Sequence, residues 1–343
     1  MFTRRVAALL GAAAVVALAV GSTTAPAQNL TVMTSVPSLG FPFFVHMMKS
    51  LVDEAKRLGV RAVESDGQNS APKQTADVEA AVVQGVAGIV ISPLDVNAMA
   101  PAIKTAIDNG VPVVTIDRRV AGVAGITAHV GADNVKGGEA QGRWVMETFP
   151  NGATIVNLQG QPGASPAIDR NKGLHNVLDA HMDKYRLVAE QTANFARDQG
   201  LNVTESLMAG MGTPPDVIVA ANDDMALGAI EALRADGRAG KVPVTGIDGI
   251  QLAVEAIIAG EMAGTVSWDP FWQGGMGLSL GYHAKTGKFD PAKEPHGRRE
   301  FYGRGAVVTA ENAKEFYEAN IKKSPELDWS DIWGRVTGQI QYG

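Results

Sequence analysis

Short apolar segments rich in β-branched residues recur along the chain, and amphipathic segments separate them. The apolar segments show no period-two alternation, which is typical of strands that are buried on both faces of a parallel sheet. The clearest of them read GIVISP, VPVVTID, ATIVNLQG, DVIVAAN and VPVTGID. Strands that alternate with helices in this way indicate a doubly wound α/β fold.

The segments between the strands carry apolar residues at spacings of three and four, which predicts helices. In the first of them Phe44, Met48 and Leu51 lie on one face, and Gly59 is expected to end the helix. A late helix is expected to begin with Thr309 as its N-cap. The other helices are predicted over residues 73–84, 98–108, 135–148, 167–180, 225–235, 251–259 and 273–285.

The alternation of strands and helices runs twice along the chain. The first run covers residues 28–132 and the second covers residues 133–268. The stretch of about 269–303 is predicted to return to the first run, and the stretch of about 304–343 to join the second as its tail. Two Rossmann-like lobes, each with its own parallel sheet, are expected from this division.

Residues 1–27 have the pattern of a cleavable export signal. Arg4 and Arg5 precede an apolar run over residues 6–21, and Ala25 and Ala27 flank Pro26 in an A-x-A cleavage site. The run is shorter than the ~20 residues that a membrane span requires, and no charged stop-transfer segment follows it. A membrane anchor is the alternative, but we expect cleavage and export to the periplasm.

Composition narrows the class of protein further. The chain has no cysteine, which excludes a small disulfide scaffold. Its formal charge of −6 argues against nucleic acid as a partner, because phosphate binding requires a basic surface. With 343 residues, the chain is long enough for two domains.

Polar residues collect where the predicted strands end, which is where ligands bind to open α/β sheets. Asp, Arg and Asn recur there, and an aromatic residue follows a strand in each half. Carboxylates accept hydrogen bonds from hydroxyls, Arg donates through a rigid fork, and an aromatic face covers the C–H side of a sugar ring. The segments read SVPSLGFPFF, SDGQN, SPLD and IDRR in the first half, and LQGQPGAS, TANF, AND and GIDG in the second.

This set predicts a site for a polyhydroxy ligand, but each member has a structural alternative. Asp117 and Arg118 are also suited to form a structural ion pair, and Asp223 is expected to cap a helix. Phe41, Phe43 and Phe44 crowd around one proline in a chain with 6% aromatic residues. They suit either a buried core or a ligand with a flat apolar face.

Sequence motifs for other chemistries are absent. There is no GxxxxGK[ST] loop and no GxGxxG after a strand, so no nucleotide cofactor is expected. The six histidines show no metal-ligand spacing, and no G-x-S-x-G elbow is present. We therefore predict no cofactor, no metal and no catalytic residue, although a glycosidase-like pair of carboxylates is an alternative that the sequence leaves open.

Taken together, these motifs resemble the periplasmic sugar-binding proteins of the ribose-binding type, which serve ABC importers. The resemblance covers nearly the whole chain after the signal, in the family's order. It implies two lobes joined by a three-strand hinge, a monosaccharide or sugar alcohol between them, a membrane permease as partner, and a monomer. The matching stretches are PFF, GVAGIVISPLDVNAMAPAI, VPVVTIDRR, GADNVKGGEAQG, LQGQPGASPAIDRNKG, NFARDQGLNV, ANDDMALGAIEAL and VTGIDG.

The resemblance also assigns ligand contacts to residues of both lobes. Phe43 and Phe44 match the first-lobe aromatics that face the sugar, and Phe195 matches the aromatic residue on the other side of the ring. The polar contacts that it implies are Asp117, Arg118, Arg170, Asn222 and Asp248.

Three positions depart from the ribose-binding pattern. Phe41 stands in place of an asparagine, Trp268 in place of a hinge glutamine, and Ile247 in place of a phenylalanine. Phe41 and Trp268 are therefore expected to belong to the site and to alter its specificity. Another pentose, a hexose, a deoxy sugar and a sugar alcohol are alternatives to ribose.

Other functions share parts of this pattern. A sensor that presents bound sugar to a chemoreceptor or a histidine kinase would use the same binding step. A periplasmic sugar-acting enzyme would need a nucleophile or an acid/base pair, and none is identified. The effector domain of a cytoplasmic repressor has the same fold, but the export signal argues against it. A non-enzymatic binding protein is the function that the sequence predicts best.

Overall fold

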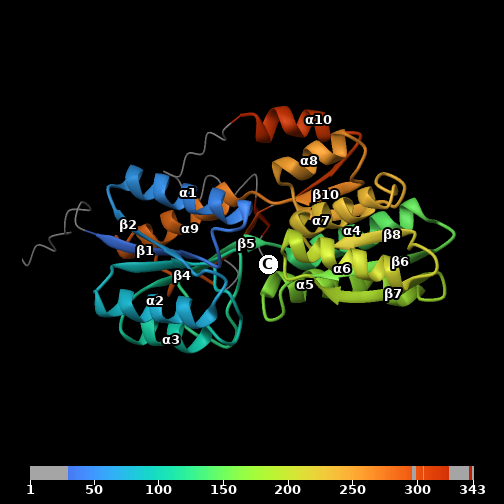
Figure 1. Ribbon diagram of the computed structural model, residues 1–343. Coiled ribbons are helices and arrows are strands. Elements are labelled where there is room, and N and C mark those ends of the chain that lie inside the picture. Colours follow the sequence, from blue (N-terminus) through green and yellow to red (C-terminus); the bar gives the residue numbers. More distant parts are fainter. Residues whose placement is uncertain (1–29, 296–298, 304, 324–339, 342–343) are drawn as a thin grey trace, which may run out of the picture.

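The computed structural model describes residues 30–295, 299–303, 305–323 and 340–341. The predicted export signal lies outside the described residues, as does most of the stretch after residue 323. The described chain forms two lobes side by side, and each is built around one sheet with helices on both faces (Figure 1). This architecture confirms the predicted doubly wound α/β fold.

The first lobe holds a seven-stranded sheet in the order β13-β11-β5-β4-β3-β1-β2. Neighbouring strands run parallel, apart from the antiparallel pair β11 and β13. The strands are β1 (Thr31–Val36), β2 (Arg61–Asp66), β3 (Gly88–Ile91), β4 (Val113–Ile116), β5 (Ala128–Ala132), β11 (Glu300–Gly303) and β13 (Ile340–Gln341). The helices are α1 (Pro42–Leu58), α2 (Ala71–Val83), α3 (Ala100–Asp108) and α9 (Pro270–Lys285).

The second lobe holds a six-stranded sheet in the order β12-β10-β9-β8-β6-β7, in which only β10 and β12 pair antiparallel. The strands are β6 (Ala153–Gln159), β7 (Tyr185–Thr192), β8 (Val217–Ala220), β9 (Val244–Asp248), β10 (Gly264–Ser267) and β12 (Ala306–Thr309). The helices are α4 (Asn134–Thr148), α5 (Ser165–Leu178), α6 (Arg197–Gly210), α7 (Asp223–Ala235), α8 (Gln251–Ile258) and α10 (Ala313–Phe316), with a 3₁₀ turn at Asp179–His181 and a π-helical turn at Tyr317–Ile321.

Burial explains why the strand segments lack alternation. Every residue of β4, β5, β8 and β9 is buried, because helices cover both faces of the sheet there. The edge strand β7 alternates between half-buried and exposed residues along most of its length. In the first lobe α1 and α9 pack on one side of the sheet, and α2 and α3 enclose the core on the other.

The chain passes between the lobes after β5, after β10 and between β11 and β12. These three passages agree with the three-segment connection that the resemblance implied, and the chain returns once more to the first lobe between Ile321 and β13. Because strands of both lobes end toward the junction, the loops that follow β4, β6, β8 and β9 face one another there (Figure 1).

The predicted start of the late helix is wrong. Thr309 is the last residue of β12, and α10 begins at Ala313 with Asn312 as its N-cap. The backbone N–H of Thr309 donates to Oδ1 of Asn312 at 2.9 Å, so the Asn312 side chain closes the turn that separates the strand from the helix. Within the described residues, no helix has the length and apolar character that crossing a membrane requires.

Candidate functional site

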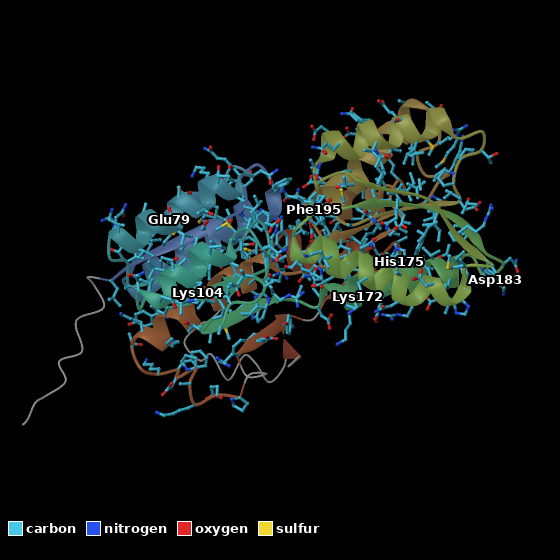
Figure 2. All side chains as sticks on the ribbon, turned by 90° about the horizontal axis from the view of Figure 1, so that it is seen from below. Glu79, Lys104, Lys172, His175, Asp183 and Phe195 are labelled. Atoms are coloured by element: carbon cyan, nitrogen blue, oxygen red, sulfur yellow. The ribbon has the colours of Figure 1, made fainter. Side chains whose placement is uncertain are left out.

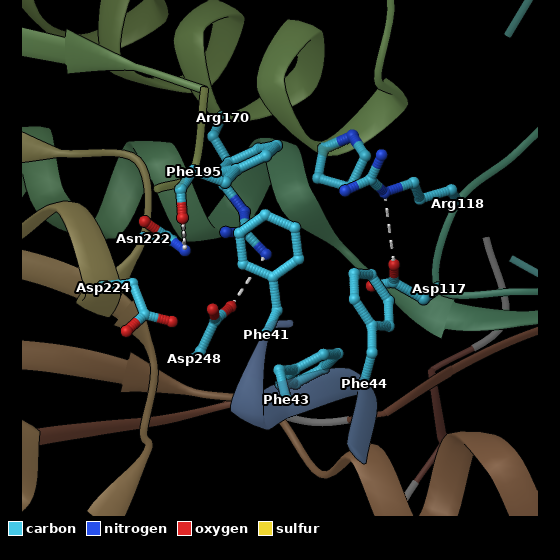
Figure 3. Close-up of a pocket in the computed structure, with 11 residues that line it drawn as sticks. Phe41, Phe43, Phe44, Asp117, Arg118, Arg170, Phe195, Asn222, Asp224 and Asp248 are labelled. Atoms are coloured by element: carbon cyan, nitrogen blue, oxygen red, sulfur yellow. Dashed lines mark hydrogen bonds and ion pairs between the residues drawn. The ribbon is translucent and has the colours of Figure 1, made fainter. Parts of the chain in front are cut away.

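A pocket lies between the two lobes (Figure 3). Its cavity volume is only about 30 Å³, so the side chains that line it leave little free space between them. The lining includes nine of the ten predicted site residues, together with two that the sequence did not indicate. The lining residues are Phe41, Phe43, Phe44, Asp117, Arg118, Pro166, Arg170, Phe195, Asn222, Asp224 and Asp248.

The start of α1 supplies the aromatic wall of the first lobe. Pro42 takes the first helical position, where its fixed φ suits the helix and its missing N–H is not needed. Phe43 and Phe44 are buried and meet edge to face, with ring centroids 5.7 Å apart. Phe41 precedes the helix in an extended conformation and packs against the apolar cores of both lobes. These rings therefore bound the pocket from one side.

Phe195 supplies the aromatic wall of the second lobe and lies at the junction of the lobes (Figure 2). Its backbone has a φ of 62°, which is unusual for a residue with a side chain. Nδ2 of Asn222 donates to the Phe195 carbonyl at 3.2 Å and holds this conformation. The ring lies over Gly160, where an added Cβ would come within 2.1 Å of it. Only glycine leaves room for the ring at that strand end.

Asp117 and Arg118 follow β4 and are almost completely buried. Ser92 donates to Oδ2 of Asp117 at 3.1 Å. Nη1 of Arg118 donates to the Leu94 carbonyl at 3.0 Å and to Oε1 of Gln161, in the other lobe, at 3.2 Å. Nε of Arg118 lies 3.8 Å from Oδ2 of Asp117, and it makes no hydrogen bond to any described residue.

The Arg118 guanidinium also lies between two aromatic walls. It is 5.3 Å from the ring centroid of Phe44 and 5.6 Å from that of Phe195. Cation–π attraction at these distances helps to hold a charge that burial disfavours. The planar group is thereby fixed at the pocket. Its Nε–H lies beside Asp117 without a hydrogen bond to a described residue, so a ligand oxygen could accept from it.

Arg170 of α5 is held on three sides. Nε donates to Oδ1 of Asn134 at 2.8 Å, Nη1 to the Ala221 carbonyl at 2.6 Å, and Nη2 to Oδ1 of Asp248 at 3.3 Å. Asn134 is the first residue of α4, so it ties Arg170 to the start of the second lobe. Arg170 therefore positions Asp248 in addition to lining the pocket.

The start of α7 differs from the prediction in which residue caps the helix. Asn222, not Asp223, is the N-cap, because Oδ1 of Asn222 accepts from the backbone N–H of Met225 at 3.0 Å. Asn222 therefore combines capping with a place on the pocket wall. Asp224 also lines the pocket and pairs with Arg197, Nη2 to Oδ1, at 3.0 Å. The sequence did not indicate Asp224, and its place after the AND motif is the signal that could have found it.

Burial dominates the electrostatics of the pocket. It raises the pKa of Asp117, although the charge of Arg118 opposes the shift. Burial raises the pKa of Asp248 well above its usual range, against the charge of Arg170. Burial also lowers the pKa of Arg118 to about 10. These charges are removed from water and lack some of the partners that water would provide, so a ligand with several hydroxyls would restore hydrogen bonds to them.

Trp268 is the one predicted site residue that does not line the pocket. It is buried at the junction of the lobes, where its backbone N–H donates to the Asp248 carbonyl at 3.1 Å. Its ring fills the space beside Gly137 of α4 and Gly305, which precedes β12. At Gly305 an added Cβ would lie 2.5 Å from the ring. The structure therefore places Trp268 among the segments that connect the lobes.

The rim of the pocket is closed by contacts between the lobes. The backbone N–H of Val96 donates to the Gly163 carbonyl at 2.9 Å, and the N–H of Arg119 donates to Oγ of Ser165 at 2.9 Å. Nε2 of Gln161 donates to Oδ1 of Asn69 at 3.1 Å. Arg119 and Asp169 form an ion pair across the same rim. The lobes are therefore in a closed arrangement around the pocket.

In the part of the chain that the structure describes, no group of three or more His, Cys, Asp and Glu is placed to hold a metal ion.

Residues 32–289 match the model of the periplasmic binding protein domain. The chain belongs to the periplasmic binding protein family. This periplasmic binding protein is 40% identical to a Caulobacter myo-inositol binding protein whose crystal structure contains myo-inositol, with a TM-score of 0.78. That match covers 83% of this chain and 95% of the Caulobacter chain.

Two further relatives are similar to most of this chain. An ABC transporter solute-binding protein of Bacillus halodurans with bound myo-inositol is 29% identical, covers 86% of this chain and 99% of its own, and has a TM-score of 0.78. The ribose import binding protein of Bacillus subtilis is 39% identical over 71% of this chain and 77% of its own length.

The family is one of binding proteins rather than enzymes, which confirms the prediction of a non-enzymatic sugar-binding protein. This periplasmic binding protein is of the ribose-binding-like type and binds a monosaccharide or sugar alcohol in the cleft between its lobes.

Proposed function

We propose that the protein captures a cyclic polyol, with myo-inositol as the first candidate, in the interlobe pocket and delivers it to the permease of an ABC importer. Its place of action is the periplasm. Support for the location and the partner comes from the family and from the signal-like segment at residues 1–27.

The observation that carries the proposal is the Nε–H of Arg118, which makes no hydrogen bond to a described residue, at a pocket that also presents three carboxylates. A buried donor without an acceptor costs about 1–3 kcal/mol, which a ligand hydroxyl oxygen would recover. The carboxylates of Asp117, Asp224 and Asp248 can each accept from a hydroxyl hydrogen. A ligand that carries a hydroxyl at every ring carbon meets such donors and acceptors on all sides.

Phe41 favours a cyclitol over ribose. It lines the pocket where the ribose binders have an asparagine, so one polar contact is replaced by an aromatic surface. Such a surface packs against ring C–H groups and provides no hydrogen-bond donor for the ring oxygen of a sugar. The two relatives that hold myo-inositol support the same choice. Ribose is the second candidate, because the Bacillus subtilis relative is a ribose import binding protein.

Titration calorimetry of the purified protein tests the proposal directly. We expect binding of myo-inositol with an affinity at least tenfold higher than that of D-ribose. A higher affinity for D-ribose than for myo-inositol would instead support ribose as the ligand. Absence of binding to either ligand, and to a panel of pentoses, hexoses and polyols, would contradict a sugar or polyol ligand.

Arg118→Ala tests the site itself. The substitution removes a charged donor from a desolvated pocket and leaves Asp117 without its neighbouring cation, so we expect an affinity loss of roughly 10- to 100-fold. Arg143→Ala is the matched control, since Arg143 is exposed on α4 and pairs only with Glu139 among the described residues. Calorimetry that found wild-type affinity in Arg118→Ala would overturn the site assignment.

A further inference from the structure

The turn that presents Asp248 to the pocket has a backbone that side chains rarely adopt. Asp248 is the last residue of β9 and has a φ of 132°, and Gly249 follows with a φ of 73°. A non-glycine residue in such a region costs of order 1–3 kcal/mol, so surrounding contacts must hold it there. The contacts that hold this turn therefore decide where the Asp248 carboxylate points.

Two buried polar side chains make those contacts. Oδ2 of Asp223 accepts from the backbone N–H of Ile250 at 2.9 Å, and Oδ1 accepts from the hydroxyl of Thr265 at 2.7 Å. The Thr265 hydroxyl in turn accepts from the backbone N–H of Gly249 at 3.2 Å. Both residues that follow Asp248 are thus fixed by one network, which we call the turn clamp and define as Asp223 with Thr265.

The clamp lies behind the pocket. Asp223 is completely buried at the start of α7, and neither it nor Thr265 is among the pocket-lining residues. Gly246 makes room for it, because an added Cβ there would come within 2.3 Å of Oδ1 of Asp223. β9 and α7 therefore approach one another closely at this point.

Helix capping does not explain the Asp223 carboxylate, since Asn222 already caps α7. Burying a carboxylate is unfavourable unless hydrogen bonds compensate it. The pKa of Asp223 is raised to about 7 by this burial, although its hydrogen bonds from the Thr265 hydroxyl and the backbone N–H of Ile250 oppose the shift. Each of these partners belongs to the turn or supports it.

We propose that Asp223 and Thr265 are positioning residues that hold Asp248 in the backbone geometry in which its carboxylate reaches the ligand. Neither touches the ligand, and they act through the Gly249–Ile250 backbone. The inference rests on the proposed function in one respect only, that Asp248 contacts the ligand.

Thr265→Val and Thr265→Ser separate the hydroxyl from the packing of the side chain. Valine keeps the shape and removes the hydroxyl, whereas serine keeps the hydroxyl. We expect Thr265→Val to raise the Kd for myo-inositol about tenfold, which corresponds to about 1.4 kcal/mol, and Thr265→Ser to stay within about twofold of wild type. Thr204→Val is the matched control, since Thr204 is equally buried on α6 and its hydroxyl makes no hydrogen bond to a described residue.

A double-mutant cycle with Asp248→Asn shows whether the clamp acts through Asp248. If it does, Thr265→Val causes little further loss in the Asp248→Asn background, because the group that it positions has already lost its charge. The thermal unfolding of each variant is measured as well as its affinity, so that only folded proteins are compared. A general structural role predicts independent, multiplying losses in affinity.

Wild-type affinity in Thr265→Val, an equal loss in Thr265→Ser, or multiplying losses in the double variant would overturn the positioning role. Wild-type affinity in Asp248→Asn alone would overturn the assignment of Asp248 to the site, and with it the proposed binding mode. The two failures are therefore distinguishable.

Discussion

At the scale of single residues, Phe41 occupies an unusual position. It lies just before α1, lines the pocket and packs against the cores of both lobes. Its ring meets Phe44 edge to face, with centroids 6.3 Å apart. A residue that contacts both lobes and the ligand space influences which ligands the closed pocket accepts.

Phe41→Asn should shift specificity toward ribose. The substitution restores the amide that the ribose binders carry and removes the aromatic surface, so we expect the ratio of myo-inositol to ribose affinity to fall at least tenfold by calorimetry. Val45→Asn, at an exposed position one turn further along α1, is the control. An unchanged ratio in Phe41→Asn would mean that Phe41 does not set specificity.

The site residues differ in how far the sequence reveals them. Asp117 and Arg118 follow a buried strand and Asp248 ends one, and the parallel sheet alone brings such positions to one edge. Asp224 was missed because it lies inside a helix and pairs with Arg197, a contact between two helices that no local pattern encodes. The place of Trp268 depends on glycines far away in the sequence, so tertiary packing alone decides it.

At the scale of elements, the loop between β6 and α5 makes hydrogen bonds to the other lobe that hold the pocket closed. Residues 160–165 supply Gln161, Gly163 and Ser165, each of which bonds to the other lobe. Gly163 has a φ of 81°, and an added Cβ would lie 1.8 Å from Oδ2 of Asp95, across the rim. The closed arrangement therefore requires glycine at this position, for conformation and for space.

Gly163→Ala should weaken ligand binding more than it weakens the fold. The methyl group would clash with Asp95 only when the lobes close, so we expect at least a tenfold loss of affinity. Small-angle scattering at saturating ligand should also show a larger radius of gyration than for the wild type. Gly260→Ala is the matched control in the same lobe, with a φ of 77° and nothing within 4 Å of the added Cβ.

Both variants place an alanine in a left-handed backbone conformation, which costs roughly 1–2 kcal/mol, so their unfolding temperatures should fall by similar amounts. An affinity loss of the same size in both variants would show that the loop does not act through closure.

Elements were predicted well where an amphipathic or fully apolar pattern is long. The predicted limits of α1, α4 and α7 agree with the structure to within two residues. The helix after Thr309 was placed too early, because the β-branched pair at the end of β12 pairs with β10 and extends the strand instead. The paired residues of β10 and β12 are 39 to 45 positions apart in the sequence, so no local pattern signals the pairing.

At the scale of the whole molecule, the first lobe contains a buried histidine in its central sheet. His129 on β5 is 5% exposed, and Nδ1 forms a 2.9 Å hydrogen bond with Thr115. Its pKa is lowered to about 3, chiefly by burial and also by the charge of Arg119. Between about pH 3 and the ordinary value of 6.5, the unfolded chain binds more protons at this position than the folded chain, so the contribution of His129 to stability rises with pH.

His129→Gln should remove that dependence. Glutamine keeps a hydrogen-bonding group near Thr115 and cannot be protonated. We expect the free energy of unfolding of the wild type, relative to the variant, to be lower at pH 4 than at pH 7 and constant above about pH 7. Urea unfolding at a series of pH values measures it, with His181→Gln at an exposed position as the control for loss of a histidine. A difference that stayed constant from pH 4 to pH 7 would contradict a neutral buried His129.

The path of the chain through the two lobes also sets the order in which they can be completed. Strands β6 to β10 follow one another between Ala153 and Ser267, so the second sheet lacks only its edge strand β12 when that stretch has left the ribosome. The first lobe cannot cover α1 until α9 has been synthesised, because those two helices pack on each other. The apolar face of α1 is therefore covered only after most of the second sheet has been synthesised.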